Sequence, residues 1–180
     1  PLAGTPVLFE EDGRPPVIIV ADSAGALHFC VDNESQADCI SYQVPDYTIL
    51  KPANPALDQI PADWDGSSFD LYYCGKVAAN SRCWRLSYAF GDDEREASVT
   101  SVWTLPALLA SAETPTAPLV PYSNSVSLNS FFVGCGQNIY KYSKSDGILI
   151  ADTDISFAGD QVISNIMPNP AGHGIYGGSN

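Results

Sequence analysis

Short runs of branched and aromatic apolar residues, several of them alternating with polar positions, recur along most of the chain. Such runs favour β-strands, because these side chains suit a pleated surface with at least one buried face. The clearest runs are residues 17–20, 26–30, 69–74, 83–90, 98–104, 131–133 and 139–142. Pairs of Asp and Gly at 12–13, 65–66, 91–92 and 146–147 are typical of the turns between strands. The pattern predicts an all-β fold of antiparallel strands.

Residues 106–113 are the one segment with a helical pattern. Thr104 stands where a helix cap is expected, and a proline occupies the first turn, where its missing N–H has no partner to lose. Pro115 and Pro118 would end the helix soon afterwards. We therefore expect at most one short helix, near 106–113.

A degenerate unit recurs along the chain: a polar or glycine-rich approach, a short apolar strand, a turn and an aromatic strand. The apolar strands begin near 17, 69, 131 and 175, and each follows a further candidate strand, so the units start near 6, 56, 118 and 161. The spacing is near the roughly 40–50 residues of a four-stranded propeller blade. A β-sandwich or barrel would produce much the same alternation. We expect a single all-β domain over 1–180, built of repeated antiparallel sheet units and either propeller-like or a sandwich or barrel.

Four of the five cysteines form two pairs with identical spacing: Cys30 with Cys39, and Cys74 with Cys83. Both pairs flank small or polar residues between predicted strands, so a hairpin folded at its midpoint would bring each pair together. Each bond would close a loop of about ten residues and stabilise the fold by roughly 2.7 kcal/mol in the chain-entropy description. Zinc is the rival interpretation, but the spacing is wider than zinc sites use and only two histidines are present. We predict two disulfides and a buried, unreactive thiol at Cys135, with an intermolecular bridge as its alternative.

Charge and cysteine usage bear on the compartment and the partners. The chain has 21 acidic and 8 basic residues, for a net charge of −13, which would repel nucleic acid and anionic membrane surfaces. Its apolar runs are far shorter than the roughly 20 residues of a membrane span. Asn33 begins the single N-glycosylation sequon, in the loop between Cys30 and Cys39. Together with the paired cysteines, these features predict a secreted, extracellular protein.

The densest group of polar and aromatic side chains precedes the strand at 69. Asp63, Trp64 and Asp65 could bind a sugar, with the indole on its apolar face and the carboxylates on its hydroxyls, or could hold a hard cation. The structural alternative is that the aspartates form Asx turns while Trp64 covers an edge of the core. A second acidic group at 152–160 allows the same two interpretations with weaker support.

Strand alternation over 83–88 places Arg85 on one face and Trp84, Leu86 and Tyr88 on the other, which we expect to be the core face. Arg85 would then point outward, towards the acids of the preceding loop, as a surface ion pair or as a contact for a ligand. Tyr73 adds aromatic surface. The candidate ligand-binding residues are Asp63, Trp64, Asp65, Tyr73, Trp84 and Arg85.

Catalytic groups are scarce. His28 alternates with apolar neighbours on a predicted strand and His173 lies among glycines, so neither is expected to act as a general base, and no nucleophile elbow is present. Two aspartates such as Asp63 and Asp70 would suit a glycosidase only if they face each other across a cleft. No catalytic residue, metal site or cofactor is predicted.

These features favour a secreted, non-enzymatic recognition protein that binds carbohydrate. The alternatives are a secreted protein that binds another extracellular protein, such as an effector, and a small acidic glycoside hydrolase with paired aspartates. The expected partner is a glycan or an extracellular protein, and self-association stays open.

Overall fold

The computed structural model describes residues 2–32, 37–43, 51–58, 64–92, 96–103, 107–109, 113–120, 129–150 and three further two-residue strands. Every structural feature below lies within these residues. They contain no α-helix, and the strand pairs are antiparallel, so the predicted all-β fold is confirmed. Within the same residues, no helix has the length and apolar character that crossing a membrane requires.

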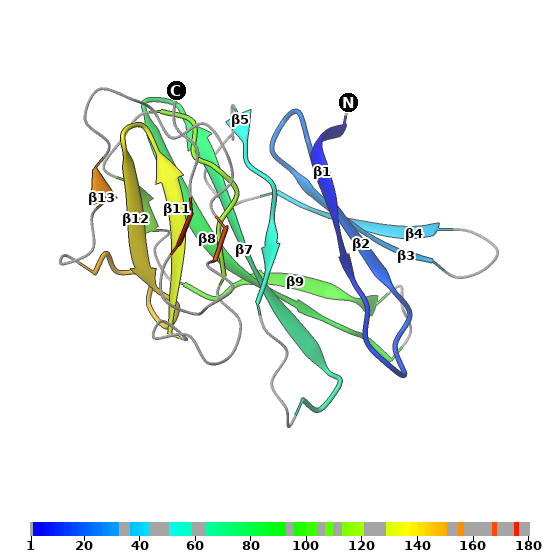
Figure 1. Cartoon of the computed structure of the whole chain (residues 1–180). Helices are drawn as coiled ribbons and strands as arrows, with labels where there is room; N and C mark the ends of the chain where they lie inside the picture. Colours follow the sequence, from blue (N-terminus) through cyan, green and yellow to red (C-terminus); the bar gives the residue numbers. More distant parts are fainter. Residues whose placement is uncertain are drawn as a thin grey trace.

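The first sheet, sheet A, is a four-stranded meander at the N-terminal end of the chain (Figure 1). Its strands are β1 (Leu2–Phe9), β2 (Val17–Asp22), β3 (Leu27–Asp32) and β4 (Ala37–Tyr42), paired in chain order. One face is apolar and buried, since β2 and β3 alternate between buried and more exposed positions. The buried residues of that face are Phe9, Val17, Ile19, Ala21, Leu27, Phe29 and Val31.

Sheet B is built on one long hairpin. Its strands β7 (Ser68–Val77) and β8 (Asn80–Ala89) pair along their whole length. The short strands β5 (Lys51–Pro52) and β6 (Ala56–Leu57) pair with β7, whereas β9 (Ser98–Ser101) and β10 (Ala107–Leu109) pair with β8.

Sheet C contains β11 (Ser130–Cys135), β12 (Asn138–Ser143) and β13 (Ile155–Ser156). Single bridges extend it, from Leu119 to Phe132 and from Tyr142 to Leu149. A separate pair, β14 (Met167–Pro168) and β15 (Ile175–Tyr176), follows in the chain.

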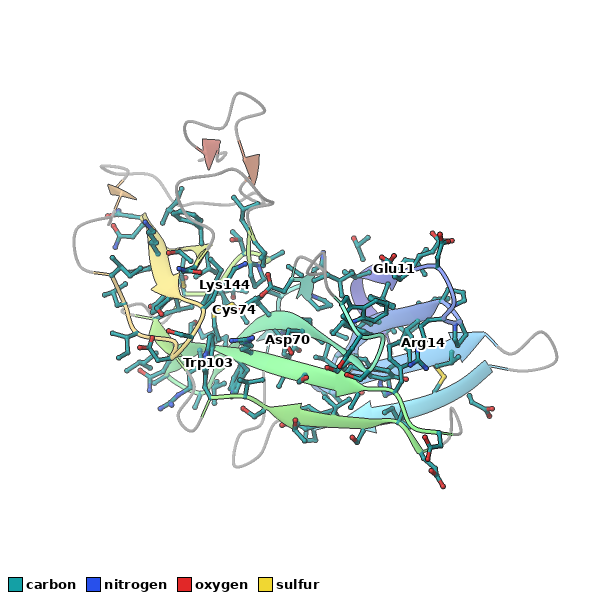
Figure 2. The ribbon with its side chains drawn as sticks, turned by 90° about the horizontal axis from the view of Figure 1, so that it is seen from below. Glu11, Arg14, Asp70, Cys74, Trp103 and Lys144 are labelled. Atoms are coloured by element: carbon teal, nitrogen blue, oxygen red, sulfur yellow. A yellow bond between two sulfur atoms is a disulfide. The ribbon has the colours of Figure 1, made fainter. Side chains whose placement is uncertain are left out.

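The two faces of the β7–β8 hairpin are both buried, because sheets A and C cover opposite sides of it (Figures 1 and 2). Side chains on one face join the core with sheet A: Phe69, Leu71, Tyr73, Trp84, Leu86 and Tyr88. Side chains on the other face join the core with sheet C: Tyr72, Cys74 and Cys83. A stacked ring pair lies at each contact. The ring centres of Phe9 and Phe69 are 4.1 Å apart, and those of Tyr72 and Phe131 are 4.7 Å apart.

Three hairpins correspond to the recurring unit seen in the sequence: β2–β3, β7–β8 and β11–β12. Their sheets follow one another through the stack in chain order, with the middle sheet covered on both faces. Each of these hairpins belongs to a sheet of its own, and the middle sheet packs against the other two.

Both predicted disulfides are confirmed. Cys30–Cys39 joins β3 to β4 and Cys74–Cys83 joins β7 to β8, each between directly opposed residues. Cys135 is buried and forms no disulfide, and its thiol donates to the carbonyl oxygen of Glu113 at 3.1 Å. Its burial agrees with the expectation of a buried thiol.

The helix expected near 106–113 is wrong where the structure describes this segment, since Ala107–Leu109 is a strand. Ala107 pairs with Cys83 and Leu109 with Ser81, and Leu109 enters the core shared with sheet C. Helix propensity is a weak preference. Backbone pairing with β8 and burial of the Leu109 side chain favour a strand here and outweigh that preference.

Candidate binding site

Three loops meet at the side chain of Arg14, at one end of sheets A and B (Figure 2). They are the turn between β1 and β2, the loop before β7, and the connection that follows β8. We call the group formed by Arg14, Trp64, Asp65 and Phe90 the Arg14 cluster.

Trp64 enters this cluster from the loop before β7. Its ring packs edge-on against Phe9 at 5.7 Å, and its indole N–H donates to the carbonyl oxygen of Ser68 at 2.6 Å. Trp64 is half-buried and packs against the core shared by sheets A and B. This agrees with the structural alternative for Trp64, and part of the residue stays accessible to solvent.

Asp65 forms the predicted Asx turn. Its Oδ1 accepts from the backbone N–H of Ser67 at 2.8 Å and from the Ser67 hydroxyl at 2.6 Å, and Gly66 follows at φ +78°. The Ser67 hydroxyl and then its N–H hold the pKa of Asp65 below its usual range, with a smaller effect from Arg14. The Asp65 carboxylate is exposed, and its lowered pKa keeps it ionised at neutral pH.

Arg14 joins the loops. Its guanidinium carbon lies 4.8 Å from the centre of the Phe90 ring, a cation–π contact, and the group lies against the turn at Gly66. Phe90 is itself tied to the loop before β7, because its N–H donates to the carbonyl oxygen of Ser67 at 2.9 Å. An Arg and two half-buried aromatic rings therefore share one short edge of the molecule.

Carboxylates surround this edge. The exposed acids in the three loops are Glu10, Glu11, Asp12, Asp65 and Asp92. Among the described residues of these loops, one Arg stands with five exposed carboxylates, and this gives a local negative potential that disfavours anionic ligands and favours neutral or cationic ones.

The other predicted ligand-binding residues lie elsewhere. Tyr73 and Trp84 oppose each other in the core between sheets A and B, with 0% and 1% of their surface exposed. Neither ring has a free face on which a sugar could stack. Asp63 lies outside the described residues, as do Asn33 and the acidic group at 152–160.

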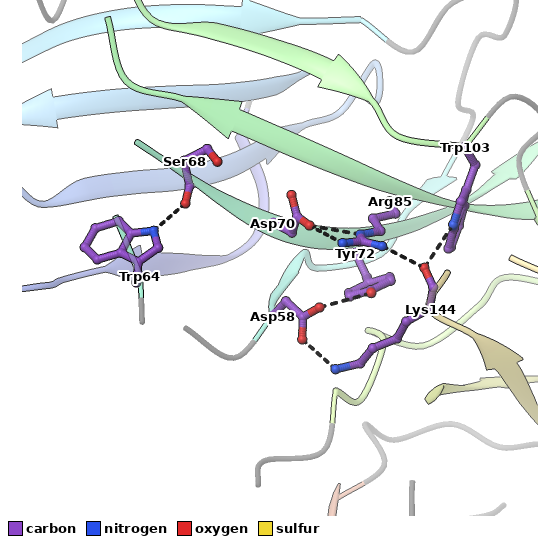
Figure 3. A network of polar contacts seen from close by, with 8 residues as sticks. All are labelled: Asp58, Trp64, Ser68, Asp70, Tyr72, Arg85, Trp103 and Lys144. Carbon is purple, nitrogen blue, oxygen red and sulfur yellow. Dashed lines mark hydrogen bonds and ion pairs between the residues drawn. The ribbon is translucent and has the colours of Figure 1, made fainter. Parts of the chain in front are cut away.

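Arg85 does not point outward as expected, because sheet C covers its face of the hairpin (Figure 3). Its Nε donates to Asp70 Oδ2 at 3.0 Å, and its Nη2 donates to the same oxygen. Its Nη1 donates to the carbonyl oxygen of Lys144 at 3.0 Å, and the Trp103 indole N–H reaches that carbonyl at 3.2 Å. An acidic partner was expected for Arg85, and Asp70 is that partner. The ion pair, however, lies where sheet C meets sheet B.

Lys144 completes this junction. Its Nζ donates to Asp58 Oδ1 at 2.5 Å, and Asp58 Oδ2 accepts from the Tyr72 hydroxyl at 3.1 Å. The turn after β12 is thus bonded by backbone and side chain to sheet B. We call the group Asp58, Asp70, Tyr72, Arg85 and Lys144 the inter-sheet network.

Two pKa shifts follow from this packing. Burial raises the pKa of the Tyr72 hydroxyl, and the negative charge of Asp58 raises it further. Burial acts to lower the pKa of Arg85, but its hydrogen bond to Asp70 and nearby negative charge outweigh that effect and raise it. Tyr72 therefore stays neutral and Arg85 stays charged at any physiological pH.

Neither group of side chains resembles a metal site or a pair of free carboxylates. Within the described residues, no three His, Cys, Asp or Glu side chains lie together as metal ligands would. Asp70 is one of the two aspartates considered for glycoside hydrolysis. It forms an ion pair with Arg85, which gives this carboxylate a structural role.

Sequence reasoning missed Arg14 and Phe90. Arg14 follows the Asp12-Gly13 turn and Phe90 precedes Gly91-Asp92, so each stands beside a recognised turn. Their proximity depends on how sheet A packs on the hairpin, which the local pattern does not specify.

Comparison with known proteins finds no matching family model, no similar curated protein and no similar solved structure.

Proposed function

We propose that the protein is an extracellular recognition protein that binds carbohydrate at the Arg14 cluster. The observation that supports this most directly is the close grouping of the half-buried Trp64 and Phe90 rings with Arg14 and the ionised Asp65. Aromatic faces suit the apolar side of a sugar ring, while a carboxylate and a guanidinium hydrogen-bond its hydroxyls. Two disulfides are compatible with an oxidising compartment.

The surrounding carboxylates narrow the class of sugar. Sialylated, sulfated and uronic-acid glycans would meet five exposed acids, so the site favours neutral or amino sugars. The ligand would be shallowly bound at loop tips, which corresponds to weak affinity for one sugar and stronger binding to a multivalent surface.

The test is a glycan array followed by NMR titration of the best hit. Asp65→Asn retains the acceptor for Ser67 and removes the charge, and Arg14→Gln removes the cation, so both variants should fold and bind more weakly. Glu113→Gln, an exposed acid beside sheet C, is the matched control and should bind normally. An array without signal, or equal weakening by Glu113→Gln, would contradict the proposal.

A second candidate function is binding of another extracellular protein, and one pair of residues favours it. Leu8 and Ile18 oppose each other on the outer face of sheet A, with 50% and 43% of their surface exposed. Exposed apolar neighbours of this kind occur at protein interfaces. Capture of a partner by the unaltered chain and not by Leu8→Ser/Ile18→Ser, with Leu108→Ser as control, would support this function over the first.

A further inference from the structure

The outer face of sheet A, turned away from sheet B, carries a chain of three hydrogen-bonded polar side chains. Ser41 Oγ lies 2.8 Å from His28 Nδ1, and His28 Nε2 lies 3.2 Å from Asp22 Oδ2. Each comes from a different strand, with Asp22 ending β2, His28 in β3 and Ser41 in β4. This is the order of contacts that activates a serine: nucleophile to imidazole, and imidazole to carboxylate.

Asp22 is fixed in the orientation that this role requires. Its Oδ1 accepts from the backbone N–H groups of Ala24 at 2.8 Å and Ala26 at 3.0 Å, which leaves Oδ2 facing the imidazole. A carboxylate at Nε2 favours the tautomer with its proton there, so the lone pair of Nδ1 points to the Ser41 hydroxyl.

The backbone holds Ser41 and His28 together. They are directly opposed residues of β3 and β4, and the next opposed pair on the same face is Cys30 with Cys39. The disulfide between those cysteines prevents the two strands from slipping relative to each other. A slip of one residue would turn Ser41 to the other face.

The group is open to an external molecule. Ser41 is exposed, and the side chains of His28 and Asp22 are 28% and 25% exposed. Beside it on the same face lie Leu8 and Ile18, and Ile18 is opposed to Cys30, two residues from His28.

We propose that Ser41 is a nucleophile that accepts the acyl group of small esters, with His28 as its general base and Asp22 as a positioning residue. Ser41 Oγ bonds to the acyl carbon and its proton passes to His28 Nδ1. The bond to the leaving oxygen then breaks, and the imidazolium returns that proton to it as the alcohol departs. Water adds to the acyl carbon by the same route, gives its proton to His28, and releases the acid as Ser41 recovers its proton.

The experiment uses the whole chain with its disulfides intact and p-nitrophenyl acetate as the probe. Release of p-nitrophenol should accompany acetylation of Ser41, located by peptide mapping. We expect Ser41 to react roughly 100-fold faster than Ser23, an exposed serine in the neighbouring turn that serves as the internal control.

Three variants separate the roles. Ser41→Ala should abolish the adduct, and His28→Gln should reduce its rate to that of Ser23. Asp22→Asn keeps the acceptor for Ala24 and Ala26, so it should slow acetylation without unfolding the sheet. Acetylation of Ser41 no faster than of Ser23, or p-nitrophenol release that persists in Ser41→Ala, would overturn the proposal.

Discussion

Gly147 lies directly against the indole of Trp103. A Cβ atom at Gly147 would stand 3.0 Å from the ring, and the residue adopts φ +71°, a conformation that side chains disfavour. Trp103 is 5% exposed and stacks on Phe131 at 5.6 Å, so its ring has little room to move. The turn after β12 thus depends on a glycine to bring sheet C onto the hairpin.

Gly147→Ala should therefore destabilise the protein more than the same change at Gly13. Gly13 has φ +82° and nothing within 4 Å of its Cβ position, so Gly13→Ala reports backbone strain alone, about 1 kcal/mol. Gly147→Ala adds the contact with Trp103, roughly 1–3 kcal/mol more. Urea unfolding of both variants measures the difference, and equal losses would show that the indole yields freely.

The ion pair between Lys144 and Asp58 should contribute measurable stability, because both side chains are mostly buried between sheets. Their side-chain exposures are 13% and 16%. A double-mutant cycle with Lys144→Met and Asp58→Asn should give a coupling free energy of roughly 1–3 kcal/mol. Lys141, which lies over the Phe132 ring, supplies the control, since Lys141→Met with Asp58→Asn should couple by less than about 0.5 kcal/mol.

The two disulfides should differ in their effect although they close loops of equal length, with a sequence separation of 9 in both. Loop entropy contributes roughly 2.7 kcal/mol for each. Cys74 and Cys83 are also fully buried in the core with sheet C, whereas Cys39 is exposed. Replacement of Cys74 and Cys83 by alanine should therefore lower the free energy of unfolding more than replacement of Cys30 and Cys39. The reverse order would contradict this prediction and show that burial in the core does not decide the loss of stability.

Asp22 should make stability depend on pH in the acid range. Burial acts to raise the pKa of Asp22, but hydrogen bonds from Ala26, His28 and Ala24 outweigh it and hold the pKa below its usual range. The folded state therefore favours the ionised carboxylate. The resulting gain in folding stability is fully present above the pKa that Asp22 has in the unfolded chain, and it is lost as the pH falls through the pKa in the folded protein. Melting temperatures between about pH 2 and 5 should decline less steeply in Asp22→Asn than in the unaltered chain. Identical slopes of melting temperature against pH in the two proteins would show that Asp22 does not cause the acid dependence.

Much of the fold could be predicted from local pattern. The alternation over residues 83–88 correctly assigned Trp84 to a core face, since successive side chains on a strand point to opposite sides. The identical spacing of the cysteines predicted both bonds, because a hairpin of that length brings its ends together. These are short-range consequences of backbone geometry.

The candidate sites were harder to predict. Arg85 was expected at the surface because nothing in residues 83–88 shows that a third sheet covers the polar face of the hairpin. The chain Asp22–His28–Ser41 could not be predicted because it depends on how three strands pair, and the apolar neighbours Leu27 and Phe29 made His28 resemble an ordinary strand residue.

The amino-acid sequence by itself determined the strand-rich fold class, the turns, the covalent links and which faces of single strands are apolar, because each depends on residues within one hairpin. Only the tertiary structure decided what lies opposite those faces: Arg14 on Phe90, Lys144 on Asp58, and Ser41 beside His28. Such contacts join strands and loops distant in sequence, and their free energy comes from packing and hydrogen bonds that exist only after the sheets have assembled.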